Sequence, residues 1–179
     1  MISFSSYSIF AEVPQYLLES SLIPNNQKIA VTQPRRISAT SIAQRVAEEQ
    51  RCELGTTVGY CVRFDDQSSS QTRIKFFTDG MLLRELLRDP HLTDYSVVVI
   101  DEAHERTLRT DMLLCILRQL QLARTKGLQK AGSPIGSGRP PPLKLVIMSA
   151  SLDADRFSQY FDGCVPARTH TKPDCLQVC

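Results

Sequence analysis

The sequence predicts an α/β fold in which a mostly parallel sheet lies between two layers of helices. Short apolar runs of strand length alternate along the chain with segments of helical period. The runs are continuously apolar, as in SVVVI at 96–100, which is typical of strands buried on both faces of a parallel sheet. A length of 179 residues fits one domain, because domains usually have about 100–200 residues.

The elements follow in a regular order. The expected strands span 28–32, 58–64, 73–78, 96–100 and 143–148. The expected helices span 36–50, 80–87, 110–123 and 153–161. In the first of these helices Ile37, Ile42 and Val46 are predicted to share the apolar side. The second is predicted to stop at Asp89-Pro90, since proline cannot continue a helix interior.

Two segments break this order. Residues 125–142 are rich in glycine, serine and proline and end in three consecutive prolines, which predicts an exposed loop insertion without helix or strand. Residues 163–179 have no clear period, so no element is assigned to them.

The composition is that of a soluble globular protein. Apolar residues make up 42% and charged residues 22%, and the net charge of +2 does not by itself predict nucleic-acid binding. Neither a basic signal-like N-terminus nor an apolar run near the roughly 18 residues of a membrane span is present. We therefore expect a nuclear or cytoplasmic protein without a membrane partner. The six cysteines show no zinc-ligand spacing, which favours reduced thiols.

The stretch VVVIDEAHERT, residues 97–107, places acids directly after a buried strand. Ligands of an open parallel sheet bind at the carboxyl ends of its strands, so Asp101 and Glu102 are predicted to lie where chemistry can occur. An aspartate there can hold Mg²⁺, and an adjacent glutamate can polarise an attacking water. The alternative is that the acids only begin a polar loop, and the acid pair alone does not decide between the two interpretations.

Further segments decide it, because they resemble the DEAH-box family of ATP-dependent RNA helicases in that family's order. DEAH at 101–104 resembles motif II. TQPRR at 32–36 resembles motif Ia, TDGMLLRE at 78–85 motif Ib, and SAS at 149–151 motif III, with Ser151 in place of the usual threonine. The resemblance covers residues 13–162 and implies the first RecA-like domain, of the P-loop nucleoside-triphosphatase fold.

The resemblance implies roles for residues on the nucleotide side. Asp101 would hold Mg²⁺ through water, Glu102 would share the metal site and activate water, and His104 would link the nucleotide to motif III and to a second domain. The remaining residues with implied roles are Arg45, which would stack on adenine, and Ser149 and Ser151, which would supply the coupling hydroxyls. ATP and Mg²⁺ are the cofactors implied.

RNA is the partner that the resemblance implies, together with other helicase or ribonucleoprotein components. Positions along the RNA backbone match Arg35, Arg36, Thr78, Asp79 and Gly80. The residues themselves agree, since arginines offer planar donors to phosphate oxygens and glycine lets a backbone approach RNA closely. Taken alone, the two arginines would be interpreted as a solvated helix start.

A phosphate-binding sequence is expected in this family but does not occur in the chain. It has the form G-x-x-x-x-G-K-[ST], whereas the first glycine here is Gly55 and no glycine is followed by lysine. We therefore interpret 1–12 as an atypical segment, 13–162 as a partial RecA-like domain and 163–179 as an atypical tail. We expect impaired ATP hydrolysis, with two alternatives: a non-catalytic module that binds RNA or a helicase, or a truncated product without stable function.

Overall fold

The computed structural model describes residues 8–20, 23–131, 140–149, 157, 159–161, 165–168 and 175–178. Its helices are α1 (Ser8–Glu19), α2 (Arg36–Glu49), α3 (Asp79–Arg88), the short 3-10 helix η1 (Ala103–Glu105) and α4 (Leu108–Ala131). Its strands are β1 (Lys28–Gln33), β2 (Val58–Val62), β3 (Asp65–Gln67), β4 (Ile74–Thr78), β5 (Tyr95–Ile100), β6 (Lys144–Ser149), β7 (Val165–Arg168) and β8 (Cys175–Val178).

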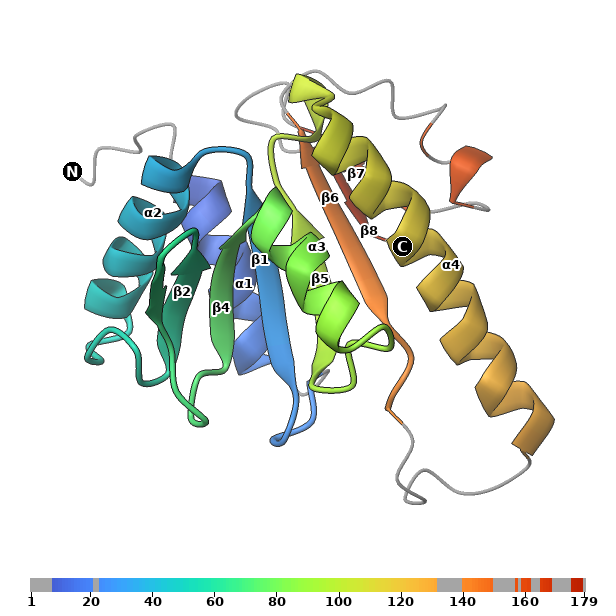
Figure 1. The fold of residues 1–179 in the computed structure, drawn as a ribbon, viewed down its shortest axis with the longest axis horizontal. Coiled ribbons are helices and arrows are strands. Elements are labelled where there is room, and N and C mark those ends of the chain that lie inside the picture. The colour runs from blue at the N-terminus through green and yellow to red at the C-terminus, as the bar shows by residue number, and fades with distance from the viewer. Residues whose placement is uncertain are drawn as a thin grey trace.

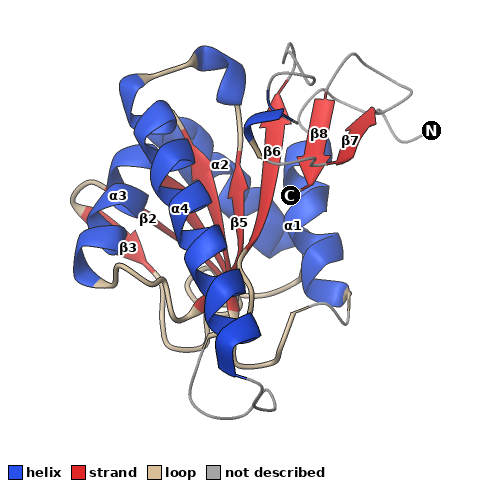
Figure 2. Cartoon of the chain, turned by 90° about the vertical axis from the view of Figure 1, so that its right-hand side faces the viewer, coloured by secondary structure: helices blue, strands red, loops and turns tan. Residues whose placement is uncertain are grey.

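The strands form one eight-stranded sheet in the order β3-β2-β4-β1-β5-β6-β8-β7. The strands from β2 to β6 in this order pair in parallel. The short strands β3, β7 and β8 are antiparallel to their neighbours at the two ends of the sheet. Helices α3 and α4 cover one face of the sheet, and α1 and α2 cover the other (Figures 1 and 2). The predicted three-layer α/β fold is therefore confirmed.

Strand β5 shows why its sequence is apolar without a break. All six of its residues are buried. Val98 and Ile100 face the core that contains the leucines of α3 and α4. Val97 and Val99 face the core beneath α1 and α2, because successive side chains of a strand point to opposite faces. The same run therefore contributes side chains to both cores. It also fixes the position of Asp101, which directly follows the buried strand.

The predicted burial of Ile37 is wrong, although α2 itself forms where expected. Ile42 and Val46 are buried, whereas Ile37 is 80% exposed. Ile37 lies five residues before Ile42, which is a rotation of about 140° around the helix axis. It therefore lies outside the stripe that packs on the sheet and projects from the first turn of α2.

Helix α4 also differs from its predicted bounds, since it continues to Ala131 and so enters the predicted loop insertion at 125–142. The prediction of a loop is wrong for 125–131. These residues include Lys126, Leu128, Gln129 and Lys130, which favour helices, and one interior glycine costs only about 1 kcal/mol. Residues 132–139, where glycine, serine and proline gather, lie outside the described residues.

Three short strands and part of a helix complete the comparison. Strands β3, β7 and β8 were not predicted, and β7 and β8 lie in the tail to which no element was assigned. Of the helix expected at 153–161, Phe157, Gln159 and Tyr160 are helical, and most of the others lie outside the described residues. Helix α1 starts at Ser8, before the matching segment begins at 13. No helix in the described ranges is long and apolar enough to cross a membrane.

Candidate functional site

The parallel strands bring the sequence motifs to one edge of the sheet. Strand pairing places Gln33 beside Thr78 and Thr32 beside Ile100. Because parallel strands end at the same edge, the segments that follow them lie next to one another. We call this the carboxyl edge, which comprises Thr32–Arg36, Thr78–Gly80, Asp101–Arg106 and Ser149. Ser151 lies outside the described residues, so its relation to this edge is not described.

Asp101 is held firmly at the end of β5. Its side chain is buried, with 1% of the residue exposed. One carboxylate oxygen accepts the backbone N–H of Glu102 at 2.7 Å, and the other accepts the side-chain amide of Gln33. Its own N–H donates to the carbonyl of Thr32 at 3.3 Å. These three hydrogen bonds fix Asp101 and the orientation of its carboxyl group at the end of the strand.

Glu102 and His104 form the turn that follows. Glu102 has a φ of +53° and Arg106 a φ of +48°, so left-handed residues stand on both sides of η1. Such conformations typically cost about 1–3 kcal/mol and are common where a side chain must be aimed. Nδ1 of His104 lies 3.3 Å from Oε2 of Glu102, and about 30% of each side chain is exposed. The turn therefore presents a carboxylate and an imidazole together beside the buried Asp101.

The arginines after β1 lie on the surface of the same edge. The side chain of Arg35 is 75% exposed and its Nη2 lies 3.1 Å from Oε1 of Glu105. Arg36 is 58% exposed and lies 3.8 Å from the carboxylate of Asp65. Both guanidinium groups are thus accessible, and each is held by an acid from another segment of the edge. Accessible guanidinium groups are suited to phosphate oxygens.

Asp79 lies inside the edge instead of on it. The residue is 3% exposed, and its Oδ2 accepts the hydroxyl of Thr110 at 2.6 Å. Burial raises the pKa of Asp79, while Thr110, Thr32 and Thr107 lower it in part. Oδ1 of Asp79 and Oγ1 of Thr32 each lack a hydrogen bond of normal geometry. The carboxylate therefore joins α3 to the start of α4 and does not face the surface.

Because Asp79 is buried, only two of the three residues predicted at 78–80 to contact RNA are partly accessible. Thr78 is half-buried at the N-terminus of α3, and Gly80 is also partly accessible. A Cβ at Gly80 would lie 3.5 Å from Cδ of Arg109, so an ordinary side chain would fit against that arginine. The partly accessible residues of this turn are thus Thr78 and Gly80, and Asp79 anchors them from inside.

Arg45 is not brought to the carboxyl edge. It lies nine residues after Arg36 along α2, which is roughly 14 Å at 1.5 Å per residue. There its Nε donates to Glu49 at 2.8 Å, and Glu49 also accepts the amide of Gln15 from α1 at 2.7 Å. Ser149, by contrast, ends β6 at the carboxyl edge and is buried, with 1% exposed.

Sequence reasoning missed Arg63 and Phe64, which follow β2 at this same edge. Phe64 is 90% exposed and adopts a φ of +67°. The guanidinium carbon of Arg63 lies 4.8 Å from the centre of its ring, and the next residue, Asp65, pairs with Arg36. An aromatic residue beside an arginine just past a strand end was the available signal, but the pair had been assigned to the strand itself.

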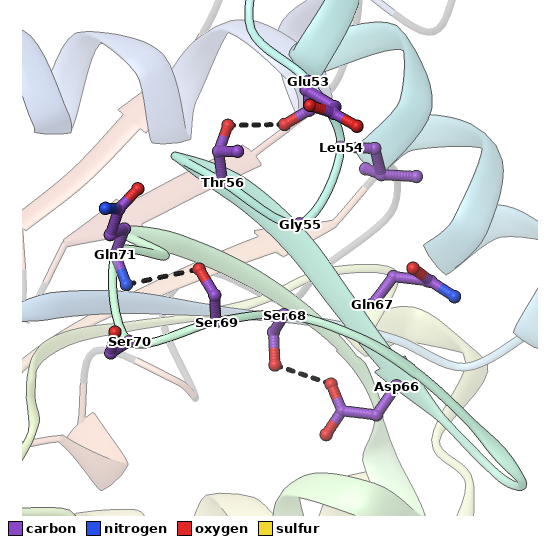
Figure 3. A pocket seen from close by; sticks show the side chains of 10 residues that line it. All are labelled: Glu53, Leu54, Gly55, Thr56, Asp66, Gln67, Ser68, Ser69, Ser70 and Gln71. Atoms are coloured by element: carbon purple, nitrogen blue, oxygen red, sulfur yellow. Dashed lines mark hydrogen bonds between the residues drawn. The ribbon is translucent and has the colours of Figure 1, made fainter.

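A shallow pocket of about 480 Å³ lies elsewhere, between the loop before β2 and the loop after β3 (Figure 3). It is lined by Glu53–Thr56 and Asp66–Gln71. Its only charged side chains are the acids Glu53 and Asp66, and it contains none of the predicted site residues. Within the described part of the chain, no three His, Cys, Asp or Glu side chains gather as a metal site.

Comparison with known proteins agrees with the motifs. No family model matches the chain. It is 44% identical over 177 residues to the pre-mRNA-splicing factor ATP-dependent RNA helicase DEAH10 of Arabidopsis thaliana, covering 85% of this chain and 25% of that protein. It is 53% identical over 152 residues to the ATP-dependent RNA helicase DHX33 of Homo sapiens, in a match that covers 85% of this chain and 20% of that protein. The mouse DHX33 protein is 52% identical over 151 residues, with 84% and 20% covered.

These relatives cover most of this chain, whereas the chain spans only a fifth to a quarter of their length. The α/β fold and the order of the motifs along the carboxyl edge agree with that similarity. The chain is therefore homologous to the DEAH-box ATP-dependent RNA helicases and corresponds to a segment of them.

Proposed function

We propose that this chain serves as part of the first RecA-like domain of an RNA helicase, in which one sheet edge bears both nucleotide-side acids and RNA-backbone contacts. The observation that supports this is the gathering of Arg35–Arg36, Thr78–Gly80 and Asp101–His104 at the ends of neighbouring parallel strands. Under this proposal residues 13–162 are the part of the domain that resembles the family, and the protein acts on RNA in the nucleus or the cytoplasm.

On the nucleotide side, the donor set fits Mg²⁺, which prefers a few carboxylates and completes its shell with water and phosphate oxygens. Asp101 and Glu102 would hold the ion, which when bound neutralises the charge of a nucleoside triphosphate. Gln33 and the Glu102 N–H orient Asp101 for this role. Glu102 would polarise the attacking water, and His104 would orient Glu102 and couple it to Ser149 and Ser151. Arg45 would contact the adenine.

On the RNA side, the contacts are to the sugar-phosphate backbone. Arg35 and Arg36 would bind phosphate oxygens, and Thr78 and Gly80 would lie against the backbone next to them. Phe64, stacked on Arg63 at the same edge, adds an exposed ring on which a base can stack. Phosphate contacts of this kind grip a strand without selecting its sequence.

A second candidate function is RNA binding without nucleotide turnover. It is favoured by the exposure of Arg35 and Arg36, whose guanidinium groups can bind RNA phosphates without a bound nucleotide. The two candidates differ in RNA-stimulated phosphate release from ATP, which the first predicts for a chain that contains the whole nucleotide site and the second does not.

The experiment that tests RNA binding is fluorescence anisotropy with a labelled single-stranded oligouridylate. The chain should bind with an affinity that falls steeply between about 50 and 200 mM salt. The double variant Arg35→Gln/Arg36→Gln should bind more weakly and lose about 0.7 from the log–log salt slope per contact. The control is Arg88→Gln. Arg88 lies at the C-terminus of α3, away from the carboxyl edge, and its side chain is 78% exposed and pairs with Glu85. Equal losses in both variants would contradict the proposed site.

A further inference from the structure

Three arginines of the carboxyl edge form ion pairs with carboxylates. Arg35 is 3.1 Å from Glu105, Arg36 is 3.8 Å from Asp65, and Arg106 holds Asp111 with contacts of 2.8 and 3.1 Å. Arg106 and Asp111 are near neighbours in one segment, whereas the other two pairs each join separate segments. The Arg35–Glu105 pair spans the longest separation of the three, 70 positions. It ties the segment after β1 to η1, the turn that follows Asp101.

Glu105 binds Arg35 through a guanidinium N–H group that an RNA phosphate would also use. Carboxylates and phosphates bind a guanidinium through the same N–H groups, so an arginine cannot offer one fork fully to both. The pair is also exposed on the arginine side, with 75% of the Arg35 side chain accessible and 28% of Glu105. RNA can therefore reach Arg35 while Glu105 is still bound to it.

We propose that Glu105 is an internal competitor for the RNA phosphate at Arg35, and that RNA displaces it. This inference rests on the proposed RNA contact of Arg35 and adds a residue that controls its strength. A strand of RNA must replace an anion that is already in place, so binding to this arginine is weaker and less dependent on salt than binding to a bare guanidinium.

Displacement has a second consequence, because Glu105 belongs to the turn that presents Glu102 and His104. The N–H of Glu105 donates to the carbonyl of Glu102 at 2.9 Å, and that of Arg106 to Ala103 at 3.4 Å. Left-handed residues stand at both ends of this short turn. Release of Glu105 from Arg35 removes the contact that ties the turn to the segment after β1. The arrival of RNA is thereby transmitted to the acid and imidazole of the nucleotide side.

The first test is Glu105→Gln, which keeps the shape of the side chain and removes its charge. An exposed ion pair is worth about 0.2–1 kcal/mol, so affinity for oligouridylate should rise about 1.4- to 5-fold. The log–log salt slope should steepen by up to about 0.7, since in the wild type the cation released from the RNA phosphate is offset by the cation that the freed Glu105 attracts. The matched control is Asp94→Asn, which removes the same charge from the Lys28–Asp94 pair of 2.9 Å at the opposite edge. It should leave both quantities unchanged.

A double-mutant cycle shows whether Glu105 acts through Arg35. In the Arg35→Gln background, Glu105→Gln should give no gain in affinity. An equal gain in both backgrounds would overturn the inference, because it would reflect only the general field of one lost charge. No gain in the wild-type background, where Arg35→Gln itself weakens binding, would also overturn it. If Arg35→Gln does not weaken binding, the proposed RNA contact fails instead.

Hydrogen exchange gives a readout that does not depend on variants. The amides of Glu105 and Arg106 should exchange faster when oligouridylate is added to the wild-type chain, and Glu105→Gln should show faster exchange there without RNA. Unchanged exchange at both amides under saturating RNA would contradict displacement of Glu105, whatever the affinities are.

Discussion

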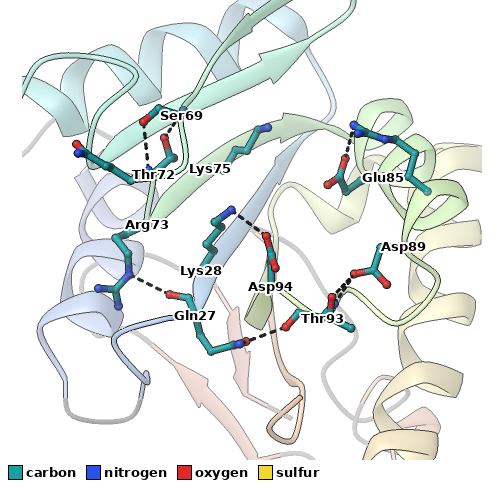
Figure 4. A network of polar contacts seen from close by, with 12 residues as sticks. Gln27, Lys28, Ser69, Thr72, Arg73, Lys75, Glu85, Asp89, Thr93 and Asp94 are labelled. Atoms are coloured by element: carbon teal, nitrogen blue, oxygen red, sulfur yellow. Dashed lines mark hydrogen bonds and ion pairs between the residues drawn. The ribbon is translucent and has the colours of Figure 1, made fainter. Parts of the chain in front are cut away.

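At the amino edge of the sheet, the loops before β1, β4 and β5 are joined by contacts that end mainly on backbone carbonyls (Figure 4). Arg73 donates to the carbonyls of Gln27 at 2.9 Å and Pro24 at 3.2 Å, and Gln27 donates to that of Thr93 at 3.2 Å. Lys28 adds an ion pair to Asp94. At the carboxyl edge, the arginines contact side-chain carboxylates instead.

The difference lies in what a ligand can replace. A backbone carbonyl that accepts a hydrogen bond cannot leave without disturbing the loop that contains it, whereas a carboxylate can rotate away from an arginine. Buried side-chain atoms that lack a hydrogen bond of normal geometry occur at both edges. Gln27 has such an atom at the amino edge, and Thr32 and Asp79 each have one near the carboxyl edge. The amino edge is therefore joined by contacts that are hard to replace, whereas the arginines of the carboxyl edge contact carboxylates that can rotate away.

The largest expected effect is on stability at the amino side, through Arg124 of α4. Its guanidinium is buried and donates to the carbonyls of Tyr95 at 2.8 Å and Leu92 at 3.0 Å. Arg124→Met leaves both carbonyls without this partner, so we expect a loss of about 2–4 kcal/mol in the free energy of unfolding by urea. Arg88→Met, on the exposed arginine of α3, should cost less than about 0.5 kcal/mol. Equal costs would mean that the two carbonyl acceptors of Arg124 contribute nothing to stability.

The next effect is on RNA affinity at the carboxyl edge, through Phe64. Stacking of a base on an aromatic ring is worth about 1–3 kcal/mol, so Phe64→Ala should weaken oligouridylate binding by roughly that amount. Stability should change little because the ring is 90% exposed. Tyr16→Ala removes a ring that is 65% exposed on α1 and should leave binding intact. An equal loss in both variants would show that Phe64 has no special role.

A smaller effect concerns the pH dependence of stability at Asp79. Burial raises the pKa of this carboxyl in the folded chain, so the unfolded chain loses the proton first as pH rises above the ordinary aspartate value of about 3.9. The contribution of Asp79 to stability therefore falls as pH rises through this range and then levels off above the folded pKa. Asp79→Asn should remove that decline. Urea unfolding between about pH 4 and pH 7 measures it.

The difference in unfolding free energy, wild type minus Asp79→Asn, should therefore become smaller with rising pH. A difference that grows with pH would mean that Asp79 is stabilised as an anion, and that the buried carboxyl does not act as described. Asp94→Asn provides the control here, since its side chain is 64% exposed.

The smallest effect is on the Lys28–Asp94 pair itself. Asp94→Asn removes an exposed ion pair and should lower the free energy of unfolding by no more than about 1 kcal/mol. The backbone hydrogen bond from Lys28 to the carbonyl of Asp94, at 2.8 Å, is retained in this variant. A loss much larger than this in urea unfolding would show that side-chain pairs, and not backbone acceptors, hold the amino edge.

The sequence predicted those features that a local pattern determines. Unbroken apolar runs identified the parallel strands and, with them, the edge at which Asp101 and Arg35 lie. It missed β3, β7 and β8, because strands of three or four residues have too short a pattern and are placed by the strands they pair with. The predicted burial of Ile37 was wrong because it depends on which side of α2 packs on the sheet. The predicted end of α4 was wrong because the helix continues until glycine, serine and proline become frequent.

The sequence predicted that the candidate site residues follow neighbouring strands, but not which contacts their side chains make. Motif positions assigned Asp79 to the RNA backbone, and only the tertiary structure shows its carboxylate against Thr110. The pairing of Arg35 with Glu105 joins segments far apart in sequence, so no local pattern contains it. Whether Asp101, Glu102, His104 and Arg45 act on a nucleotide remains a prediction of the proposed function.

Mapping of RNA on the chain tests the central claim most directly. Hydrogen exchange measured with and without oligouridylate should change at Thr32–Arg36, Arg63–Asp65, Thr78–Gly80 and Ala103–Arg106. The loops at 24–28, 72–73 and 93–95 should not change, because the contacts that join them end mainly on backbone carbonyls. Changes confined to the amino edge, or no change at the carboxyl edge under saturating RNA, would contradict the account.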